Sequence, residues 1–244
     1  MTGTAVPSKR WLRHEPTGAA VHLLCIPHAG AGAASFTRWL GLFPPSVAAV
    51  RVQLPGREDA TAEQPLRRVR DAVDGLLPEV RELGERVALY GHSMGALVAF
   101  ELARALSGSG REPVHLFVSG RRAPHLPAEK ASIHHLPESE FAAALEAMGI
   151  GTPHRGRALR RYVLPLIKAD LELSEEYEHR PEPQLRCPIT TFHGTGDPVV
   201  DANQLEAWRT RTTGPFAMHT FPGDHFFHQR HREAIAATMA KALE

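Results

Sequence analysis

The sequence predicts an α/β protein in which helices cover both faces of a mostly parallel sheet. Between residues 21 and 119, apolar runs of strand length alternate with segments of helical periodicity, a pattern typical of parallel sheets. From Arg121 to about Pro183 this alternation stops, and helix-like segments follow one another with no strand-like run between them. A length of 244 residues fits one domain of this class. We therefore expect a single domain over residues 1–244, with a helical insertion at about 121–183.

The first half of the chain supplies four predicted strands with helices between them. The strands are short apolar runs and cover Val21–Ile26, Val47–Val52, Val87–Tyr90 and Val114–Ser119. The helices are expected at Ser35–Phe43, Arg67–Leu83 and Ala96–Leu106. The polar lead-in over residues 1–17 adds an edge strand at most.

The second half begins with the insertion and returns to the sheet. Helical patterns in the insertion cover Glu138–Met148, Arg157–Lys168 and Asp170–Glu178. An insertion after a sheet strand is most simply a lid over the strand ends, where open α/β sheets bind ligands. Beyond it, two strands are expected at Ile189–Phe192 and Phe216–Phe221, and two helices at Asn203–Thr210 and Arg232–Leu243.

Charge and composition disfavour several classes of function. Lysine plus arginine number 28 and aspartate plus glutamate 27, so the formal charge of +1 does not support a nucleic-acid or membrane-surface role. No apolar stretch reaches the ~18 residues of a membrane span, and Met1–Pro16 lacks the apolar core of a signal peptide. Cys25 and Cys187 lie far apart, outside any Cys-x-x-Cys pattern, which favours buried thiols in a reducing compartment. We expect a cytoplasmic protein without nucleic-acid or membrane partners.

The candidate nucleophile is Ser93 in the pentapeptide Gly91-His92-Ser93-Met94-Gly95. Glycine and serine are common residues, so the pattern alone is weak and also fits a glycine-rich turn. Here, however, an apolar strand precedes it and an alanine-rich helix follows it. This is the strand–turn–helix context of a nucleophile elbow, in which the glycines let the helix pass close to the strand.

An acid and a histidine follow in the order that such a nucleophile needs. Asp197 lies in a glycine-rich loop after a predicted strand, and His225 follows the last strand and a Pro-Gly turn. Asp201 is the near competitor as the acid, but it stands at the expected N-cap of a helix. Asp170 and Asp224 rank lower. The order Ser93, Asp197, His225 is the order of the α/β-hydrolase fold.

The loop His28-Ala29-Gly30-Ala31-Gly32 follows the first strand, where this fold places one half of its oxyanion hole. We expect the backbone N–H of Ala29 to be one donor and that of Met94 to be the other. A phosphate-binding interpretation is poor, because neither Gly-Lys-Ser/Thr nor Gly-x-Gly-x-x-Gly is present. The alternative is that the loop is only a tight strand–helix turn.

Histidines at His225, His228 and His231 raise the question of a metal site. Successive steps of three residues advance about 300° around a helix, so these side chains diverge. No cysteine or carboxylate joins them at ligand spacing. We therefore predict neither a metal site nor a cofactor.

Two groups of residues in the insertion leave alternatives open. Several large apolar side chains could line an acyl pocket but could equally be core between insertion and body: Phe141, Leu145, Met148, Tyr162, Leu166 and Leu173. A basic cluster could be a solvated face or a dock for an acidic partner, and it consists of Arg155, Arg157, Arg160 and Arg161.

Motifs along nearly the whole chain resemble those of the type II thioesterases that accompany polyketide and nonribosomal peptide synthases. The motifs are Pro27-His28-Ala29-Gly30, Leu54-Pro55-Gly56-Arg57-Glu58, the Ser93 pentapeptide, Ser119-Gly120-Arg121-Arg122-Ala123-Pro124, Asp197-Pro198 and Pro222-Gly223-Asp224-His225-Phe226-Phe227. The resemblance implies Ser93, Asp197 and His225 as the triad and Ala29 and Met94 as the oxyanion donors. It also implies a substrate, an acyl group thioesterified to the phosphopantetheine arm of a carrier protein. The chain departs from the family where Gly30-Ala31-Gly32, His193-Gly194 and Asp224 replace consecutive glycines.

The residues alone leave other functions open. A serine triad cleaves oxygen esters as well as thioesters, so a general carboxylesterase or lipase is the first alternative. An acyltransferase or cyclase would use the same acyl-enzyme. A carrier-protein-binding module with a vestigial triad is a different class, which the intact triad and small-residue loops disfavour.

Overall fold

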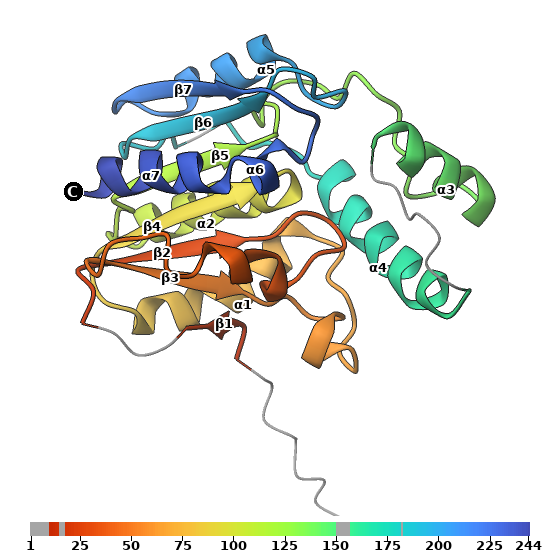
Figure 1. Ribbon diagram of the computed structural model, residues 1–244, viewed down its shortest axis with the longest axis horizontal. Coiled ribbons are helices and arrows are strands. Elements are labelled where there is room, and N and C mark those ends of the chain that lie inside the picture. Colours follow the sequence, from red (N-terminus) through yellow and green to blue (C-terminus); the bar gives the residue numbers. More distant parts are fainter. Residues whose placement is uncertain (1–9, 15–17, 150–156, 182) are drawn as a thin grey trace, which may run out of the picture.

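The computed structural model describes residues 10–14, 18–149, 157–181 and 183–244, with residues 157–160 described by their backbone alone. Within these residues, seven strands form one sheet in the order β1-β3-β2-β4-β5-β6-β7 (Figure 1). Neighbours are parallel except β1, which pairs antiparallel with β3 at the edge. The strands span Leu12–Arg13, Val21–Ile26, Val47–Val52, Val87–His92, His115–Ser119, Ile189–Gly194 and Phe216–Phe221 for β1 to β7. The predicted α/β class is confirmed.

Helices cover both faces of the sheet (Figure 1). Helices α1 (Val69–Glu82) and α2 (Met94–Gly108) pack on one face, and α7 (Arg232–Leu243) packs on the other with a 3₁₀ helix over Ala33–Trp39. Apolar residues recur every three or four positions along α1, which gives it one buried stripe against the sheet. The central strand β4 is buried along its whole length, as expected of a parallel strand covered on both faces.

Between β5 and β6 the chain forms α3 (Glu138–Ala147) and α4 (Arg157–Glu175), which lie at the right-hand end of the sheet in Figure 1. Two helices predicted on either side of Ala169 are one continuous helix, because nothing there interrupts the buried face of Leu164, Ile167 and Leu171. Pro165 lies inside the same helix without ending it.

Two other predicted helices differ from those observed. The segment expected at 35–43 is the 3₁₀ helix Ala33–Trp39, and the one expected at 203–210 divides into α5 (Ala202–Glu206) and a 3₁₀ helix over Ala207–Arg211. Short α6 (Phe227–Arg230) precedes α7 and was not predicted. The two predicted helical regions are placed correctly, but their helix type and boundaries differ from the prediction.

The two cysteines are buried thiols, as the sequence predicts. Cys25 and Cys187 are both free and buried, and burial raises the pKa of each thiol to about 12. Both thiols are therefore protonated and unreactive at neutral pH.

None of the helices in the described part of the chain has the length and apolar character that a bilayer crossing requires.

Candidate active site

Ser93 occupies the sharp turn between β4 and α2. Its backbone has φ 55° and ψ −115°, a conformation that costs a residue with a side chain about 1–3 kcal/mol. A Cβ on Gly91 would overlap the carbonyl of Gly95, and one on Gly95 would lie 2.6 Å from the carbonyl oxygen of Pro27. The Ser93 N–H donates to the carbonyl of Ser119 at the end of β5 (2.8 Å). The turn is therefore strained and held in place by this hydrogen bond, and positions 91 and 95 leave no room for a side chain.

His225 and Asp197 come from the loops after β7 and β6, and their side chains meet. The distance from His225 Nδ1 to Asp197 Oδ2 is 2.8 Å, and the two side chains are 3% and 0% exposed. The other carboxylate oxygen accepts hydrogen bonds from the amides of Val199 (2.8 Å) and Val200 (3.3 Å). With Nδ1–H donating to a fixed carboxylate, His225 presents Nε2 as a proton acceptor. His225 lines the same cavity as Ser93.

The other three candidate acids have different structural roles. Asp201 accepts from the Gln204 amide (2.9 Å) in a capping box at the start of α5, which confirms its predicted N-cap position. Asp224 is exposed and accepts from the amide of Phe226 (2.9 Å). Asp170 is fully buried in an ion pair with Arg57. Of the four, Asp197 is the one whose carboxylate is hydrogen-bonded to the His225 ring.

The predicted oxyanion residues lie beside the nucleophile. Ala29 and Met94 line the cavity together with Ser93. Met94 is the first residue of α2, so its N–H has no acceptor one turn earlier within the helix. The next two amides of the Ala29 loop are already used, because Gly30 donates to Asp170 (2.7 Å) and Ala31 donates to the carbonyl of His28 (3.1 Å). The arrangement can place two backbone donors near a carbonyl attacked by Ser93.

Three further histidines pack around His225. His92 stacks on His228 with ring centroids 3.7 Å apart and lies 5.0 Å from His225, while His28 packs edge-on against both His92 and His228. Burial lowers the pKa of His28 to about 4 and lowers the pKa of His92 and His228 well below the usual 6.5. All three rings are therefore neutral at neutral pH. Sequence spacing did not reveal this cluster, because its members come from distant parts of the chain: the loop after β2, the end of β4 and the short helix α6.

The histidines considered as metal ligands point in different directions. His225 contacts Asp197, His228 stacks on His92, and His231 donates through Nε2 to the carbonyl of Pro222 (2.8 Å). No group of three or more potential metal ligands is found among the residues that the structure describes.

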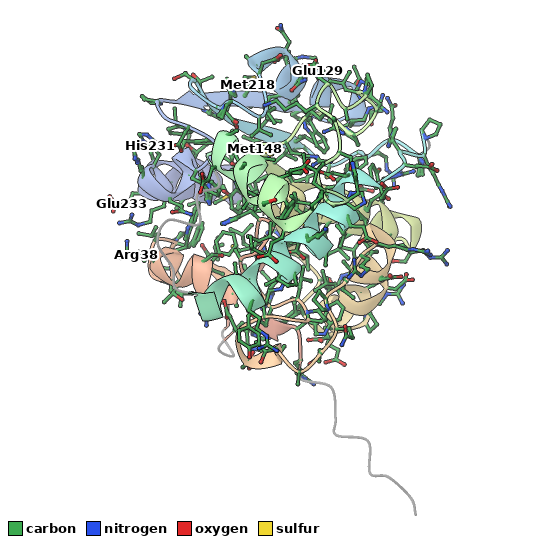
Figure 2. All side chains as sticks on the ribbon, turned by 90° about the vertical axis from the view of Figure 1, so that its right-hand side faces the viewer. Arg38, Glu129, Met148, Met218, His231 and Glu233 are labelled. Atoms are coloured by element: carbon green, nitrogen blue, oxygen red, sulfur yellow. The ribbon has the colours of Figure 1, made fainter. Side chains whose placement is uncertain are left out.

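The cavity that Ser93 and His225 line has a volume of about 350 Å³. Helix α3 and the residue after it supply one apolar wall, through Ala144, Ala147 and Met148. Figure 2 looks onto this end of the molecule, with Met148 near the centre of the view. The cavity can therefore receive an apolar group attached to a carbonyl beside Ser93.

Most residues that the sequence offered for an acyl pocket have other places. Met148 lines the cavity, but Phe141 and Leu145 are fully buried between α3 and α4, and Tyr162 is 72% exposed. Leu166 and Leu173 are also buried and are absent from the cavity wall. The structure does not describe the side chains of three members of the basic cluster, Arg155, Arg157 and Arg160. The fourth, Arg161, is exposed.

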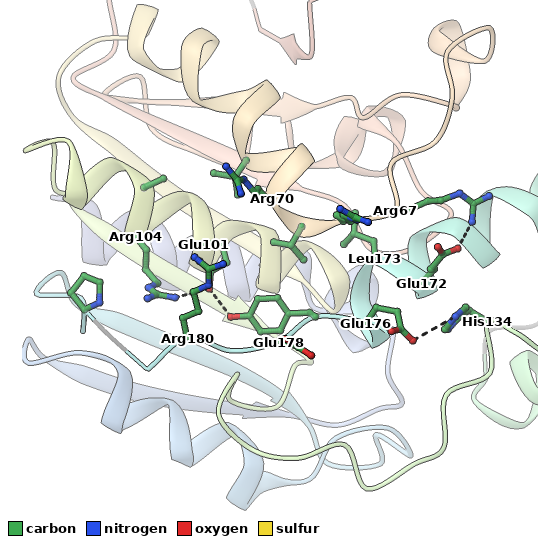
Figure 3. A pocket seen from close by; sticks show the side chains of 16 residues that line it. Arg67, Arg70, Glu101, Arg104, His134, Glu172, Leu173, Glu176, Glu178 and Arg180 are labelled. Atoms are coloured by element: carbon green, nitrogen blue, oxygen red, sulfur yellow. Dashed lines mark hydrogen bonds and ion pairs between the residues drawn. The ribbon is translucent and has the colours of Figure 1, made fainter.

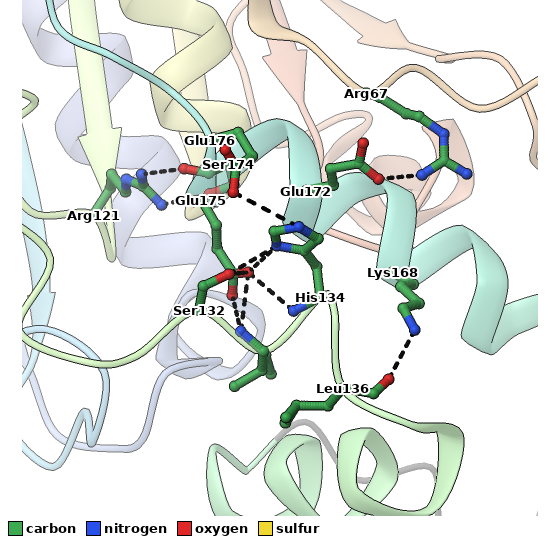
Figure 4. Close-up of polar contacts among 11 residues, drawn as sticks. Arg67, Arg121, Ser132, His134, Leu136, Lys168, Glu172, Ser174, Glu175 and Glu176 are labelled. Carbon is green, nitrogen blue, oxygen red and sulfur yellow. Dashed lines mark hydrogen bonds and ion pairs between the residues drawn. The ribbon is translucent and has the colours of Figure 1, made fainter.

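The segment before α3 is tied to the end of α4 (Figure 4). Glu175 accepts hydrogen bonds from the Ser132 hydroxyl (2.6 Å) and from the backbone and ring of His134 (3.1 and 2.7 Å). Burial raises the pKa of Glu175, but these hydrogen bonds outweigh it and the pKa lies below its usual value. Arg121 donates to the Ser174 hydroxyl (2.7 Å). These bonds fix the cavity wall relative to the strand ends.

A second cavity of about 1050 Å³ lies between α1, α2 and the end of α4 (Figure 3). Charged side chains dominate its lining and pair with one another, as Arg104 does with Glu101 (2.9 Å) and Arg67 with Glu172. Neither Ser93 nor His225 lines it. The reactive groups therefore belong to the smaller cavity.

Comparison with known proteins places these features in a family. The thioesterase domain family matches residues 21–243. The chain is 39% identical over 232 residues to the gramicidin S biosynthesis protein GrsT of Aneurinibacillus migulanus, covering 93% of this chain and 90% of that protein. It is 39% identical to thioesterase PikA5 of Streptomyces venezuelae, over 91% of this chain and 81% of the relative. The solved type II thioesterase BorB from the borrelidin biosynthetic cluster matches with a TM-score of 0.89 and 38% identity, covering 97% of this chain and 99% of that one. The predicted α/β-hydrolase fold is confirmed.

Proposed function

The chain belongs to the thioesterase family and is a hydrolase, and from this premise we propose that Ser93, His225 and Asp197 are its catalytic triad and carrier-protein thioesters its substrates. The observation that carries the proposal is the meeting of a strained serine and a carboxylate-held histidine in one cavity. Strained backbone at a non-glycine residue is concentrated at functional sites. The substrate proposed is an acyl group on the phosphopantetheine arm.

The reaction follows from the geometry in two half-reactions. The Ser93 hydroxyl attacks the acyl carbon while its proton passes to Nε2 of His225, and Asp197 stabilises the imidazolium that forms. The N–H groups of Ala29 and Met94 hold the oxyanion, a contribution of about 3 kcal/mol per donor in comparable sites. The thiolate leaves and takes up the proton from His225, which leaves an acyl-serine. Water then gives a proton to His225 and a hydroxyl to the acyl carbon. The bond from that carbon to Oγ of Ser93 breaks, Oγ takes the proton back from His225, and the free acid departs.

The leaving group favours a thioester substrate. A thiol with a pKa near ~8.5 departs as a thiolate with little assistance from an acid, unlike an amine. The apolar wall of the cavity suits the acyl chain, and the cavity volume of about 350 Å³ suits a chain of moderate size. The named relatives from gramicidin S and borrelidin biosynthesis support a partner from a biosynthetic assembly line. The proposed compartment is the cytoplasm, and the two buried free thiols support it.

We also propose that the segment at about 121–183 is a lid within a single domain over residues 1–244. It begins at the end of β5, at the carboxyl edge of the sheet from which Ser93 emerges, and the chain then returns to the opposite edge to start the parallel neighbour β6. Its helix α3 contributes one wall of the cavity, and Glu175 ties the segment before α3 to α4. Ligands bind at this edge in open α/β sheets.

The test compares one short acyl group presented in three forms: on a carrier protein, on free pantetheine and as an oxygen ester. We expect the highest kcat/KM for the carrier-borne thioester and no turnover by Ser93→Ala. Equal rates on all three forms would indicate a general esterase and refute the carrier proposal. Tight binding of the carrier with no turnover by the wild type would indicate a binding module.

A further inference from the structure

A buried ion pair joins α4 to the body of the protein. Arg57, after β3, and Asp170, in α4, meet in a two-pronged contact with Nη1–Oδ2 and Nη2–Oδ1 distances of 2.8 Å each. Their side chains are 2% and 0% exposed. Burying two charges costs more than packing apolar residues of the same volume, so stability alone is a weak reason for such a pair. What the pair touches is therefore more informative.

The pair holds the loop that carries the proposed oxyanion donor Ala29. Oδ2 of Asp170 accepts the Gly30 N–H at 2.7 Å, and Nη1 of Arg57 donates to the carbonyl of Ala31 at 3.0 Å. Two peptide groups that follow Ala29 are thus fixed by the two members of one ion pair. Helix α4 also packs directly on the loop, because a Cβ on Gly30, whose φ is 78°, would lie 2.6 Å from Cγ1 of Ile167.

Arg57 is itself fixed to the body of the protein. Its Nε donates to the carbonyl of Pro55 (3.2 Å), and its own carbonyl accepts from the Gln53 side chain (2.8 Å). The same Gln53 side chain accepts from the amide of Ala33, at the far end of the loop (2.8 Å). The loop is therefore held from the sheet side by Gln53 and Arg57 and from the α4 side by Asp170.

We propose that Asp170 is a positioning residue, which sets the Ala29 N–H through Gly30 and makes the oxyanion hole complete only when α4 is seated on the loop. This inference rests on the proposed function, because it requires Ala29 to bind the oxyanion. A displacement of about 1 Å in a reacting geometry costs about 10²-fold in rate, and one oxyanion donor is worth about 10²–10³-fold. Thioester cleavage is thereby coupled to the position of α4.

The first test is Asp170→Asn, which keeps the shape of the side chain but cannot accept from Gly30 and from both prongs of Arg57. We expect kcat to fall about 10²-fold with KM changed less than threefold, because the loss acts on the transition state. The matched control is Glu172→Gln, on the same helix, whose ion pair with Arg67 is at the surface. Its kcat and KM are expected within twofold of the wild type.

A binding measurement separates positioning from a structural role. A trifluoromethyl ketone analogue of acyl-pantetheine forms a tetrahedral adduct with the serine, whereas an amide analogue resembles the ground state. In Asp170→Asn, the Kd of the ketone should rise by the same factor as kcat falls, and the Kd of the amide should stay within threefold. Unchanged kcat and ketone affinity, with only a lower Tm, would overturn the inference.

A second variant and a wild-type control distinguish failure of this inference from failure of the proposed function. If Asp170→Asn does not fold, Arg57→Lys retains the charge but lacks the two-pronged geometry, and the same split between ketone and amide is expected. A wild type that neither hydrolyses an acyl-pantetheine nor binds the ketone would refute the proposed function itself. A wild type that does both, with variants unchanged, would refute only the role of Asp170.

Discussion

Replacement of Asp197 by asparagine tests the proposed triad acid. Asp201, four residues further along the chain, was the other nearby candidate for that role. Oδ1 of Asp197 faces two amide donors, those of Val199 and Val200, so the asparagine oxygen will take that place. The asparagine NH₂ group then faces Nδ1 of His225. Because that group donates, Nδ1 must accept and the ring proton moves to Nε2, where it blocks proton transfer from Ser93.

The expected loss is large in rate and small in stability. In serine triads of this kind the wrong tautomer lowers kcat about 10⁴-fold, which corresponds to ~5.5 kcal/mol of transition-state stabilisation. The folded state keeps the two backbone hydrogen bonds to the asparagine oxygen, and the hydrogen bond to His225 is kept with its direction reversed. We therefore expect little change in Tm for Asp197→Asn while activity almost disappears.

The control is Asp201→Ala, four residues further along the chain. Asp201 caps α5, so its loss should cost about 1 kcal/mol of folding free energy and leave kcat within twofold. The assays are steady-state hydrolysis of an acyl-pantetheine and urea unfolding of both variants. A kcat for Asp197→Asn within tenfold of the wild type, or a larger loss in Asp201→Ala, would refute the assignment.

Three further predictions concern the elbow, the histidine cluster and the cavity. In Gly95→Ala the new Cβ would lie 2.6 Å from the carbonyl oxygen of Pro27, so urea unfolding should show a loss of about 1–3 kcal/mol, and kcat should fall because α2 must retreat. The pKa of His228 is lowered in the folded state, so unfolding takes up a proton and stability falls as pH drops below about 6.5. His228→Phe should therefore reduce the slope of unfolding free energy between pH 6 and 5 by up to about 1.4 kcal/mol per pH unit, measured by urea unfolding at each pH. Ala144→Phe, inside the cavity, should lower kcat/KM for a long acyl chain at least ~10-fold relative to a short one, whereas Ala143→Phe, exposed on the same helix, should not.

The sequence predicts those parts of the fold whose causes are local. The elbow around Ser93 is an example, because the need for Gly91 and Gly95 follows from the close approach of neighbouring backbone. The N-cap at Asp201 is another, since an acid at the start of a helix is a pattern within one turn. Strand positions were also predicted closely, because an apolar run between two turns can be recognised without knowing which strands it pairs with.

Features that depend on distant segments were not predicted. Arg57 and Asp170 are 113 residues apart in the chain, and no spacing rule connects them. From the sequence alone, Asp170 is only a low-ranked candidate for the triad acid, and Arg57 has no role beyond its motif. Tyr162 fits a pocket lining by composition, but it faces solvent. The burial of an individual side chain depends on which helix packs against it, and that information is absent from a local pattern.

The site divides into a part fixed by the sheet and a part supplied by the insertion. Ser93, Asp197 and His225 follow β4, β6 and β7, and their positions are set by parallel strands and short turns. The apolar wall of the cavity instead comes from α3, which packs on α4 through Phe141 and Leu145, while Glu175 of α4 holds the segment before α3. Substitutions in that wall can change which acyl group is accepted without moving the reacting atoms. Asp170 is one of the contacts that join the two parts, and because it holds the loop of Ala29, a substitution there should alter the rate of every substrate alike.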